Sequence, residues 1–417
     1  MKKTRGATIR RAAVVAAVAM SLSAAACGGS GFSDPNAKTS QSTGPAELKL
    51  LFAGDAVGTK ALKEVGDSWA SSSGNKITIT AATDQNQELS QGFASGNPPD
   101  IFSLDSSVFA GYAKAGDLSP YAENLANKDD FNESLRQSFT FDGKFYCAPK
   151  DTSTLALIIN TDLWSKAGLT DADVPTTWDQ LESVAKKLTN GKVKGLVIGD
   201  TRDRLGAFMK ESGGWFTNAD QTKMTADTPE NLAALQYTQK LLSDGVAAYP
   251  KQVGAGWGGE AFGNGVAAMT IEGNWVKGAL KADYAGVKYK AVELPAGPAG
   301  KGTLAFTQCW GIAAKSKYQD QAQQFVETLL DKQNQLTMAT KLGVMPSIKS
   351  AQADYASQHP EDAAFVKGLE YAQGPVSAVG MDAVLKDFDT KIQGLPKADP
   401  KAILAATQKN GAAVLGG

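Results

Sequence analysis

The stretch ELKLLFAG, residues 47–54, begins an alternation of extended and helical patterns that determines the expected fold. A helical pattern at 59–72 follows, then the β-branched run KITITAAT at 76–83, a second helical pattern at 86–95, and PPDIFSL at 98–104. Strands that alternate with helices in this way indicate a mainly parallel sheet with helices on both faces. The sequence therefore predicts an α/β fold.

Two aspartates follow strands of this predicted sheet. Asp55 comes after the first strand and Asp105 after the third. Ligands of open α/β sheets bind beyond the carboxyl ends of the strands, so both carboxylates are expected on one rim of the sheet. Aspartate is also a preferred residue at helix N-caps. A binding role and a capping role both stay open for these two residues.

The pattern changes at residue 145, and the helix that follows at 176–189 begins a second unit. FYCAPKDTSTLALIIN, residues 145–160, is a long extended run, and the helical pattern at 176–189 follows it, with Thr177 and Gln180 spaced as a capping box. LAFTQCWGIAAKS, residues 304–316, is another extended segment, and Ser316 with Gln319 predicts a second capping box after it. Trp69, Trp164 and Trp178 lie on apolar helical faces and are predicted to be core residues.

The segment AAMTIEGNW, Ala267–Trp275, begins like a buried strand and then turns polar. A strand that ends in a glycine lets the backbone approach something closely. An aromatic ring beside a carboxylate and an amide suits a ligand that has both apolar faces and hydroxyl groups. A strand, a turn and one core tryptophan would give the same pattern.

Composition excludes several classes of function. The 417 residues are enough for two domains, and 42 Lys and Arg balance 43 Asp and Glu to a net charge of −1, which gives no electrostatic case for nucleic acid. The single histidine, His359, lies in a polar run typical of a solvated loop, which argues against a Ser-His-Asp triad or a histidine-based metal site. We expect no cofactor and no metal.

The N-terminus has the pattern of an export signal. Residues 1–11 are basic, residues 12–26 are apolar and small, and Cys27 follows. This pattern predicts a signal peptide over residues 1–26. The small residues before Cys27 resemble a bacterial lipobox, although Ala24 stands where leucine is commoner. We expect a lipidated Cys27 and a flexible tether over 27–46, with the protein anchored by lipid to the outer face of the cytoplasmic membrane.

Several segments together resemble the extracellular solute-binding proteins of ATP-driven sugar importers, of the maltose- and oligosaccharide-binding type. These segments are FASGNPPDIFSLD (93–105), GYAKAGDLSP (111–120), residues 145–169, PTTWDQL (175–181), FGNGVAAMTIEGNW (262–275) and residues 309–330. The resemblance implies a two-lobe periplasmic-binding-protein fold of the type II-like class, with a mixed, mainly parallel sheet in each lobe and a cleft between the lobes.

On this chain the resemblance places the lobes as follows. The N-terminal lobe holds residues 47–147 and 312–344, and the C-terminal lobe holds residues 148–311 and 345–417. The hinge crossings lie near 146–151 and 306–311.

The resemblance also implies ligand-binding residues. Trp275 is expected to stack on a sugar ring, because the C–H face of a sugar is apolar while its rim carries hydroxyls. Trp215, Trp257 and Trp310 match the family pattern less strictly, and for each of them a core role stays open. The full set of expected ligand-binding residues is Asp55, Asp105, Asp151, Trp215, Trp257, Glu272, Asn274, Trp275 and Trp310.

Once Cys27 is set aside, two cysteines remain, Cys147 and Cys309, one on each implied crossing strand. Those strands run side by side in this family, and an exported protein with one pair of cysteines favours a disulfide. We expect the pair Cys147–Cys309, with two buried free thiols as the alternative.

The implied function is sugar capture for an ABC importer. The partners are a small-molecule sugar, of di- or oligosaccharide size, and the membrane permease subunits with their cytoplasmic ATPase. The resemblance implies a monomer without catalytic activity. The alternatives are a binding protein of the same fold for a polyamine or another small polar solute, and a secreted glycosidase that uses two cleft carboxylates.

Overall fold

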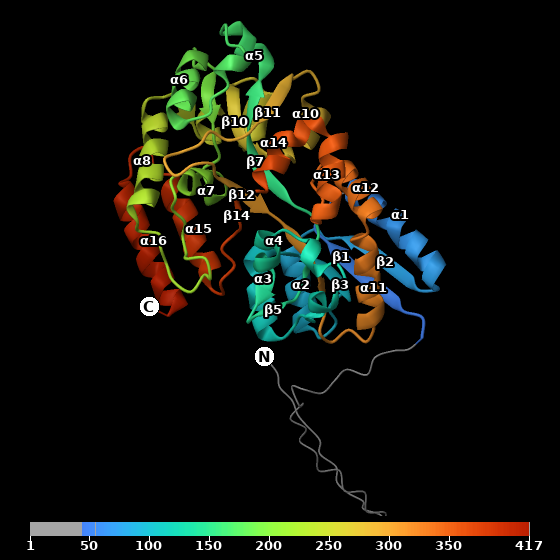
Figure 1. Ribbon diagram of the computed structural model, residues 1–417. Coiled ribbons are helices and arrows are strands. Elements are labelled where there is room, and N and C mark those ends of the chain that lie inside the picture. Colours follow the sequence, from blue (N-terminus) through green and yellow to red (C-terminus); the bar gives the residue numbers. More distant parts are fainter. Residues whose placement is uncertain (1–43, 55, 417) are drawn as a thin grey trace, which may run out of the picture. The chain divides into compact units, whose positions relative to one another are not determined.

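The computed structural model describes residues 44–54 and 56–416 (Figure 1). The predicted signal peptide, Cys27 and the tether up to residue 43 lie outside the described residues, as does Asp55. None of the helices described here is long and apolar enough to cross a membrane.

The first lobe is built around a five-stranded sheet with the strand order β2-β1-β3-β13-β6. The pairs β1–β2 and β1–β3 are parallel, and β13 is antiparallel to both β3 and β6. Its elements are β1 (Glu47–Phe52), α1 (Ala56–Ser73), β2 (Lys76–Ala81), α2 (Gln85–Ala94), β3 (Ile101–Asp105), α3 (Ser106–Ala115), α4 (Glu133–Ser138), β4 (Thr140–Phe141), β5 (Lys144–Phe145), β6 (Ala148–Pro149), β13 (Gln308–Ile312), α11 (Gln319–Leu329) and α12 (Lys332–Leu342).

The second lobe is built around a seven-stranded sheet with the order β14-β12-β7-β10-β8-β9, in which β11 also pairs with β7. Its strands are β7 (Ser153–Asn160), β8 (Lys194–Val197), β9 (Ala247–Ala248), β10 (Ala267–Gly273), β11 (Tyr289–Val292), β12 (Thr303–Phe306) and β14 (Ala372–Gln373). Its helices are α5 (Thr161–Lys166), α6 (Trp178–Leu188), α7 (Arg202–Glu211), α8 (Pro229–Ser243), α9 (Gly258–Gly263), α10 (Val276–Asp283), α14 (Ala363–Gly368), α15 (Met381–Ile392) and α16 (Pro400–Leu415). The expected two-lobe α/β architecture is confirmed.

The chain crosses between the sheets along two neighbouring extended segments. β6 continues into β7 through residues 150–152, and β12 continues into β13 through Thr307. Pro149 pairs with Cys309 and Ser153 pairs with Phe306. Between these two pairs the first segment has three residues, 150–152, and the second segment has two, 307 and 308. An extra residue in one strand of an antiparallel pair bends it, as a β-bulge does, and this bend lets the pair leave one sheet and enter the other.

A disulfide joins the two crossing segments. Cys147 and Cys309 are bonded to each other, and their Cα atoms are 5.5 Å apart. Both cysteines are fully buried. The bond closes a loop with a sequence separation of 162 residues, which contains most of the second lobe.

A third passage between the lobes leads to α13 (Lys349–Gln358). Met345 forms a β-bridge with Thr152 at the first crossing. The first turn of α13 is then bonded to the first lobe, because the backbone N–H of Ser350 donates to Asp130 Oδ1 at 3.0 Å. The expected lobe limits, including the one at 344/345, stay a prediction.

Helix starts follow the sequence in one case and depart from it in another. Thr177 caps α6, accepting a hydrogen bond from Gln180 N at 3.3 Å, as half of the predicted capping box requires. The other half differs, because Gln180 Oε1 accepts from Thr176 N at 2.7 Å and not from Thr177 N. The prediction for Ser316 is wrong, because its hydroxyl donates to Asp100 Oδ1 at 2.6 Å and the helix begins only at Gln319. The three predicted core tryptophans, Trp69, Trp164 and Trp178, are all buried.

Reduction of the disulfide should destabilise the protein by about 2–5 kcal/mol, because the unfolded chain regains the freedom of a long loop. Urea unfolding of a chain that starts after Cys27 would measure this loss with and without reductant. In the control variant Cys147→Ala/Cys309→Ala the reductant should change nothing. Two thiols that alkylate in the native wild type without reductant would contradict the prediction.

Candidate ligand-binding cleft

Two adjoining cavities lie between the lobes. The larger, here the central cavity, has a volume of about 530 Å³ and is lined by residues of both lobes. The smaller, here the polar cavity, has a volume of about 470 Å³ and extends between α4 and the segment from Lys210 to Glu230. Four residues line both of them: Trp215, Gln373, Gly374 and Pro375.

The first lobe contributes the carboxyl end of β3 to the central cavity. Asp105 lines this cavity and is exposed. It also caps α3, because Asp105 Oδ1 accepts a hydrogen bond from Ser107 N at 2.9 Å. Gln85 lies beside it and donates from Nε2 to Ser103 O at 2.7 Å. The Oε1 atom of Gln85 is buried and has no partner among the described residues, so it remains as a hydrogen-bond acceptor on this wall.

Trp215 forms the partition between the two cavities. It is half-buried, and its ring packs edge-on against Phe216 with 5.2 Å between ring centroids. Its backbone carbonyl accepts two hydrogen bonds, from Asn231 Nδ2 at 2.9 Å and from Thr225 Oγ1 at 3.0 Å. Asn231 is fully buried, so the loop that carries Trp215 is held from the protein interior.

Trp275 lines neither cavity. Its ring lies over Gly273, where a Cβ atom would collide with it, and it meets Phe306 edge-on at 5.2 Å between centroids. The guanidinium of Arg204 lies 5.1 Å from the ring centroid on another side. The close approach that Gly273 permits is thus to the ring of Trp275 itself. Phe306, the ring that Trp275 contacts, itself lines the central cavity.

Glu272 is committed to a structural ion pair. Only 1% of the residue is exposed, and its Oε2 accepts hydrogen bonds from Arg204 at 2.6 Å and from Trp275 Nε1 at 3.2 Å. Burial raises the pKa of this carboxyl, while Arg204 and Trp275 oppose the rise. Asn274 is fully buried as well, and in the described part of the chain neither Oδ1 nor Nδ2 has a hydrogen-bond partner. A buried amide of this kind is a place where a water or a ligand group would be stabilised.

Three other expected ligand-binding residues lie away from both cavities. Trp310 is 1% exposed and is a core residue of the first lobe, so its expected contact with a ligand is not available in this structure. Trp257 is half-buried, with its ring over Gly259. Asp151 is ion-paired with Lys150 beside a space of only about 10 Å³ at the hinge. Each of these side chains is occupied by the protein's own packing or charge.

Comparisons with known proteins identify the family of this chain. Residues 65–365 match the family model described as "Bacterial extracellular solute-binding protein". The chain belongs to this family. Members are non-catalytic binding proteins of ABC transporters, which excludes the glycosidase alternative.

Relatives and solved structures extend the match over most of the chain. The diacetylchitobiose binding protein DasA of Streptomyces coelicolor is 26% identical over 298 residues, which cover 67% of each chain. The galactooligosaccharide-binding protein of Bacillus subtilis is 24% identical over 402 residues, covering 93% of this chain and 92% of the relative. The cyclic alpha-maltosyl-1,6-maltose binding protein of Arthrobacter globiformis has a TM-score of 0.80 at 22% identity, covering 89% of this chain and 99% of that structure.

Sequence reasoning missed much of the lining of this family member's cleft. The missed residues include Gln85 and Asn86 on the first lobe, Arg202 and Asp203 at the start of α7, Phe306 on β12, Gln373–Val376 from the last residue of β14 onward, and Asp382 and Lys386 on α15. Phe306 could have been found, because it lies on an implied crossing strand. The residues after β14 carry no sequence pattern that distinguishes them from an ordinary loop.

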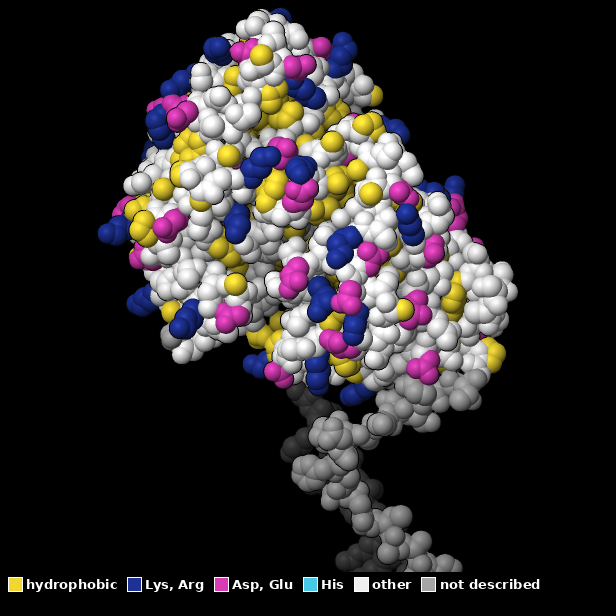
Figure 2. Space-filling view, in the orientation of Figure 1, with side chains coloured by type: hydrophobic (Ala, Val, Ile, Leu, Met, Phe, Trp, Pro, Cys, Tyr) yellow, Lys and Arg dark blue, Asp and Glu magenta, His cyan; other side chains and the backbone are white. Residues whose placement is uncertain are grey.

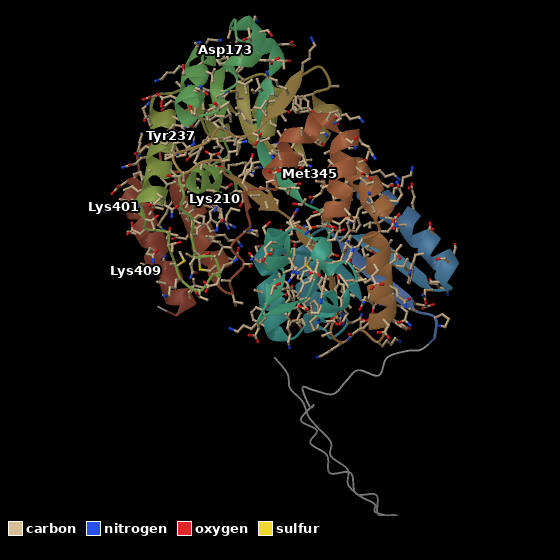
Figure 3. The ribbon with its side chains drawn as sticks, viewed as in Figure 1. Asp173, Lys210, Tyr237, Met345, Lys401 and Lys409 are labelled. Carbon is tan, nitrogen blue, oxygen red and sulfur yellow. A yellow bond between two sulfur atoms is a disulfide. The ribbon has the colours of Figure 1, made fainter. Side chains whose placement is uncertain are left out.

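Charges are mixed around the site and over the surface. Asp105, Asp203 and Asp382 line the central cavity together with Arg202 and Lys386. Lys210, labelled in Figure 3, comes from α7 and lines the polar cavity. Figure 2 shows basic and acidic side chains interspersed on the visible face. This balance favours a ligand without a large net charge.

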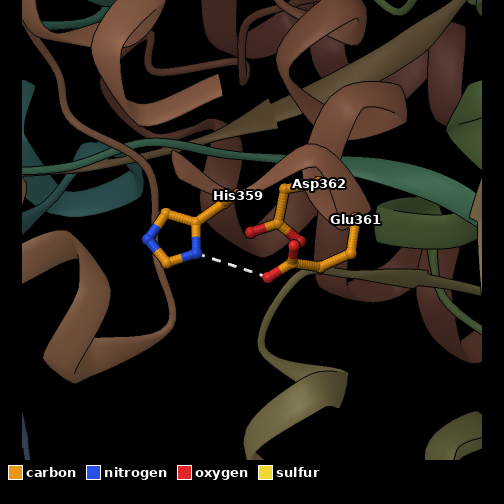
Figure 4. Close-up of side chains that lie close together, drawn as sticks. All are labelled: His359, Glu361 and Asp362. Carbon is orange, nitrogen blue, oxygen red and sulfur yellow. Dashed lines mark hydrogen bonds and ion pairs between the residues drawn. The ribbon is translucent and has the colours of Figure 1, made fainter. Parts of the chain in front are cut away.

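A separate cluster contains His359, Glu361 and Asp362 (Figure 4). Lys277 Nζ already lies 2.6 Å from both carboxylate oxygens of Asp362 and 3.5 Å from Glu361. Lys277 therefore supplies the positive charge that the carboxylates of Glu361 and Asp362 attract. We expected His359 to be a solvated loop residue, but only 19% of its side chain is exposed. Its ring packs against Tyr355, with 4.5 Å between the ring centroids.

Arg202 in the central cavity is held by Asp389, which gives a pH-dependent prediction. Burial raises the pKa of Asp389 to about 6, and Asp203 and Asp200 add to the rise, while the backbone N–H and guanidinium of Arg202 oppose it. The folded protein then binds a proton that the unfolded chain releases near pH 4. The stabilisation is complete below the unfolded pKa and is lost as pH rises through the folded pKa.

The stability of the wild type relative to Asp389→Asn should therefore fall by about 1–2 kcal/mol between pH 4 and pH 6.5, after allowance for solvent screening. Urea unfolding of both proteins across this range would measure the difference. A relative stability that rises with pH would show that the ion pair with Arg202 dominates and that the pKa of Asp389 is lowered.

Proposed function

We propose that this protein captures a di- or oligosaccharide between its lobes and delivers it to the permease of an ABC importer. The observation that carries the proposal is the position of Trp215, a half-buried aromatic ring that forms a wall of two adjoining cavities rich in polar side chains. Aromatic faces suit the C–H faces of sugars, and carboxylates and amides suit their hydroxyl rims. The carbohydrate ligands named for the relatives from Streptomyces coelicolor and Bacillus subtilis support the same class of ligand.

Asp105 and Gln85 are the proposed hydrogen-bonding residues of the first lobe, and Trp215 is the proposed stacking residue of the second. Asp55, expected on the same rim, remains a proposed contact because it directly follows Ala53 and Gly54 at the end of β1. Trp275 and Glu272 then act indirectly, because they support Phe306 rather than the ligand. Asn274, with its unpaired amide, remains a proposed polar contact for a bound solute or water.

The test is isothermal titration calorimetry against maltose-series sugars, diacetylchitobiose and galacto-oligosaccharides, with spermidine as the non-sugar. One sugar series should bind, and Trp215→Ala should weaken it by at least about tenfold, or about 1.4 kcal/mol. Trp257→Ala, a matched change of a half-buried tryptophan outside both cavities, should change the affinity by less than about threefold.

Two results would contradict the proposal. Binding of spermidine alone would favour the polyamine alternative. Sugar binding lost in Trp275→Ala but kept in Trp215→Ala would return the stacking role to Trp275.

We further propose that the protein is exported and anchored through a lipid on Cys27, because a basic start, an apolar run and small residues precede this cysteine. Growth with labelled palmitate should label the wild type and leave Cys27→Ser unlabelled. Equal release of both proteins into the medium would contradict anchoring.

A further inference from the structure

A loop of the second lobe stands among four cavities. This loop, here the strap, is AQGPVSAVG, Ala372–Gly380, and it joins β14 to α15 on the side that faces α3 and α4 (Figure 1). Residues 373–375 line the central and polar cavities. Ser377 and Val379 line two further cavities, of about 550 and 430 Å³, here the outer cavities.

The four cavities adjoin one another around the strap. Ser107 and Val108 line both the central cavity and one outer cavity, and Gln137 lines both the polar cavity and the other. The strap also reaches the first lobe, since a Cβ atom on Gly374 would lie 3.4 Å from Ser138 Oγ of α4. Residues of the strap therefore form part of the wall of all four cavities.

The strap has little regular structure to hold it. β14 pairs with β12 only at Ala372 and Gln373, and residues 374–378 are neither helix nor strand. The side chain of Gln221 binds this irregular part at three backbone atoms. Gln221 Oε1 accepts from Ser377 N at 2.7 Å and from Ala378 N at 3.0 Å, and Gln221 Nε2 donates to Pro375 O at 3.3 Å.

Gln221 keeps this position in an unfavourable backbone conformation. Its φ angle is +55°, a left-handed value that glycine and asparagine adopt more readily than glutamine. The surrounding turn fixes that angle, because Asn218 Oδ1 accepts from Thr222 N at 2.9 Å and from Lys223 N at 2.8 Å. A residue held in such a conformation, with its side-chain oxygen accepting two hydrogen bonds from one loop and its amide nitrogen donating a third to the same loop, points to a role that depends on that loop.

We propose that Gln221 is a positioning residue for ligand specificity: by fixing the strap, it sets the length of oligosaccharide that the inner cavities accept. The inference rests on the proposed function. If the strap occupies its position for only part of the time, the apparent affinity for a ligand that depends on it falls in proportion to that fraction of time. A short sugar confined to the inner cavities loses affinity in that full proportion. A longer chain loses less, because it gains contacts in the outer cavities once the strap can move.

The test compares the wild type with Gln221→Gly, which removes the clamp and relieves the left-handed backbone, so the fold is expected to remain stable. Calorimetry would use the disaccharide and the tetrasaccharide of the maltose, chitin and galactan series. Gln221→Gly should bind the disaccharide about tenfold more weakly and the tetrasaccharide no more than about twofold more weakly. The disaccharide preference should thus fall by at least about fivefold.

Two variants serve as controls. Gln221→Glu keeps an acceptor for the N–H groups of Ser377 and Ala378 and should retain most of the selectivity. Gln239→Ala removes another glutamine clamp, which donates to Leu395 O and Ala398 O at 2.6 and 2.8 Å. Gln239 lines none of the four cavities, whereas Gln221 itself lines the polar cavity and one outer cavity, so Gln239→Ala should leave the selectivity unchanged. Hydrogen exchange at Ser377 and Ala378 should become faster in Gln221→Gly and stay slow in both controls.

The outcomes separate the two proposals. If the wild type binds no carbohydrate, the proposed function fails and this inference fails with it. If the wild type binds and Gln221→Gly weakens both sugar lengths equally, or neither, the strap does not set specificity and the proposed function stands. Should Gln221→Gly not fold, Gln221→Asn replaces it, because asparagine tolerates the left-handed backbone and is one methylene too short for the clamp.

Discussion

The pairing of the two crossing segments is the constraint on which the rest of the structure depends. Residues 148–160 and 303–312 run antiparallel through both sheets, so the same pair of segments supplies strands to each lobe. Every residue of β7 is buried, and this strand pairs with β10 on one edge and with β11 and β12 on the other. Thr307 Oγ1 donates to Asp151 O at 2.7 Å where the segments leave one sheet for the other. The disulfide beside this point makes the pairing covalent.

The floor of the cleft follows from that pairing. Residues 304–308 line the central cavity, and they belong to the same segment that pairs with β7 and then with β3. Asp105 pairs with Gln308 at the end of β3. This backbone pairing fixes the position of Asp105, on the first-lobe wall, relative to residues 304–308 on the floor. The rigid part of the site is therefore set by backbone hydrogen bonds, whereas Trp215 and the strap reach it from loops that are held by side chains, Asn231 and Thr225 for Trp215 and Gln221 for the strap. Such loops are where specificity can vary without disturbing the fold.

Much of the fold was predictable from local patterns, because strand alternation and helical faces depend on neighbours in sequence. Trp69, Trp164 and Trp178 illustrate this, since a helical stripe alone identifies them as core residues. The roles of Trp275 and Glu272 depend instead on Arg204, which is 68 residues away from Glu272 in sequence and carries no motif. Trp310 matched a crossing strand correctly, but its side chain faces the first-lobe core. A strand pattern fixes alternation and leaves open which of the two faces meets the cleft.

The residues after β14 show the other limit of sequence reasoning. Gln373–Val376 form part of the cleft only because the strap lies between two lobes whose sequences are far apart. The same geometry gives the strap its significance for transport. A solute shifts the balance between two arrangements of the lobes only by the difference in its contacts with each. Contacts with one wall alone are equal in both arrangements, so in the site that we propose, discrimination depends on a solute that touches Asp105, Trp215 and the strap together. In the same proposal, the fixing of the strap by Gln221 makes this simultaneous fit depend on the length of the ligand as well as on its chemistry.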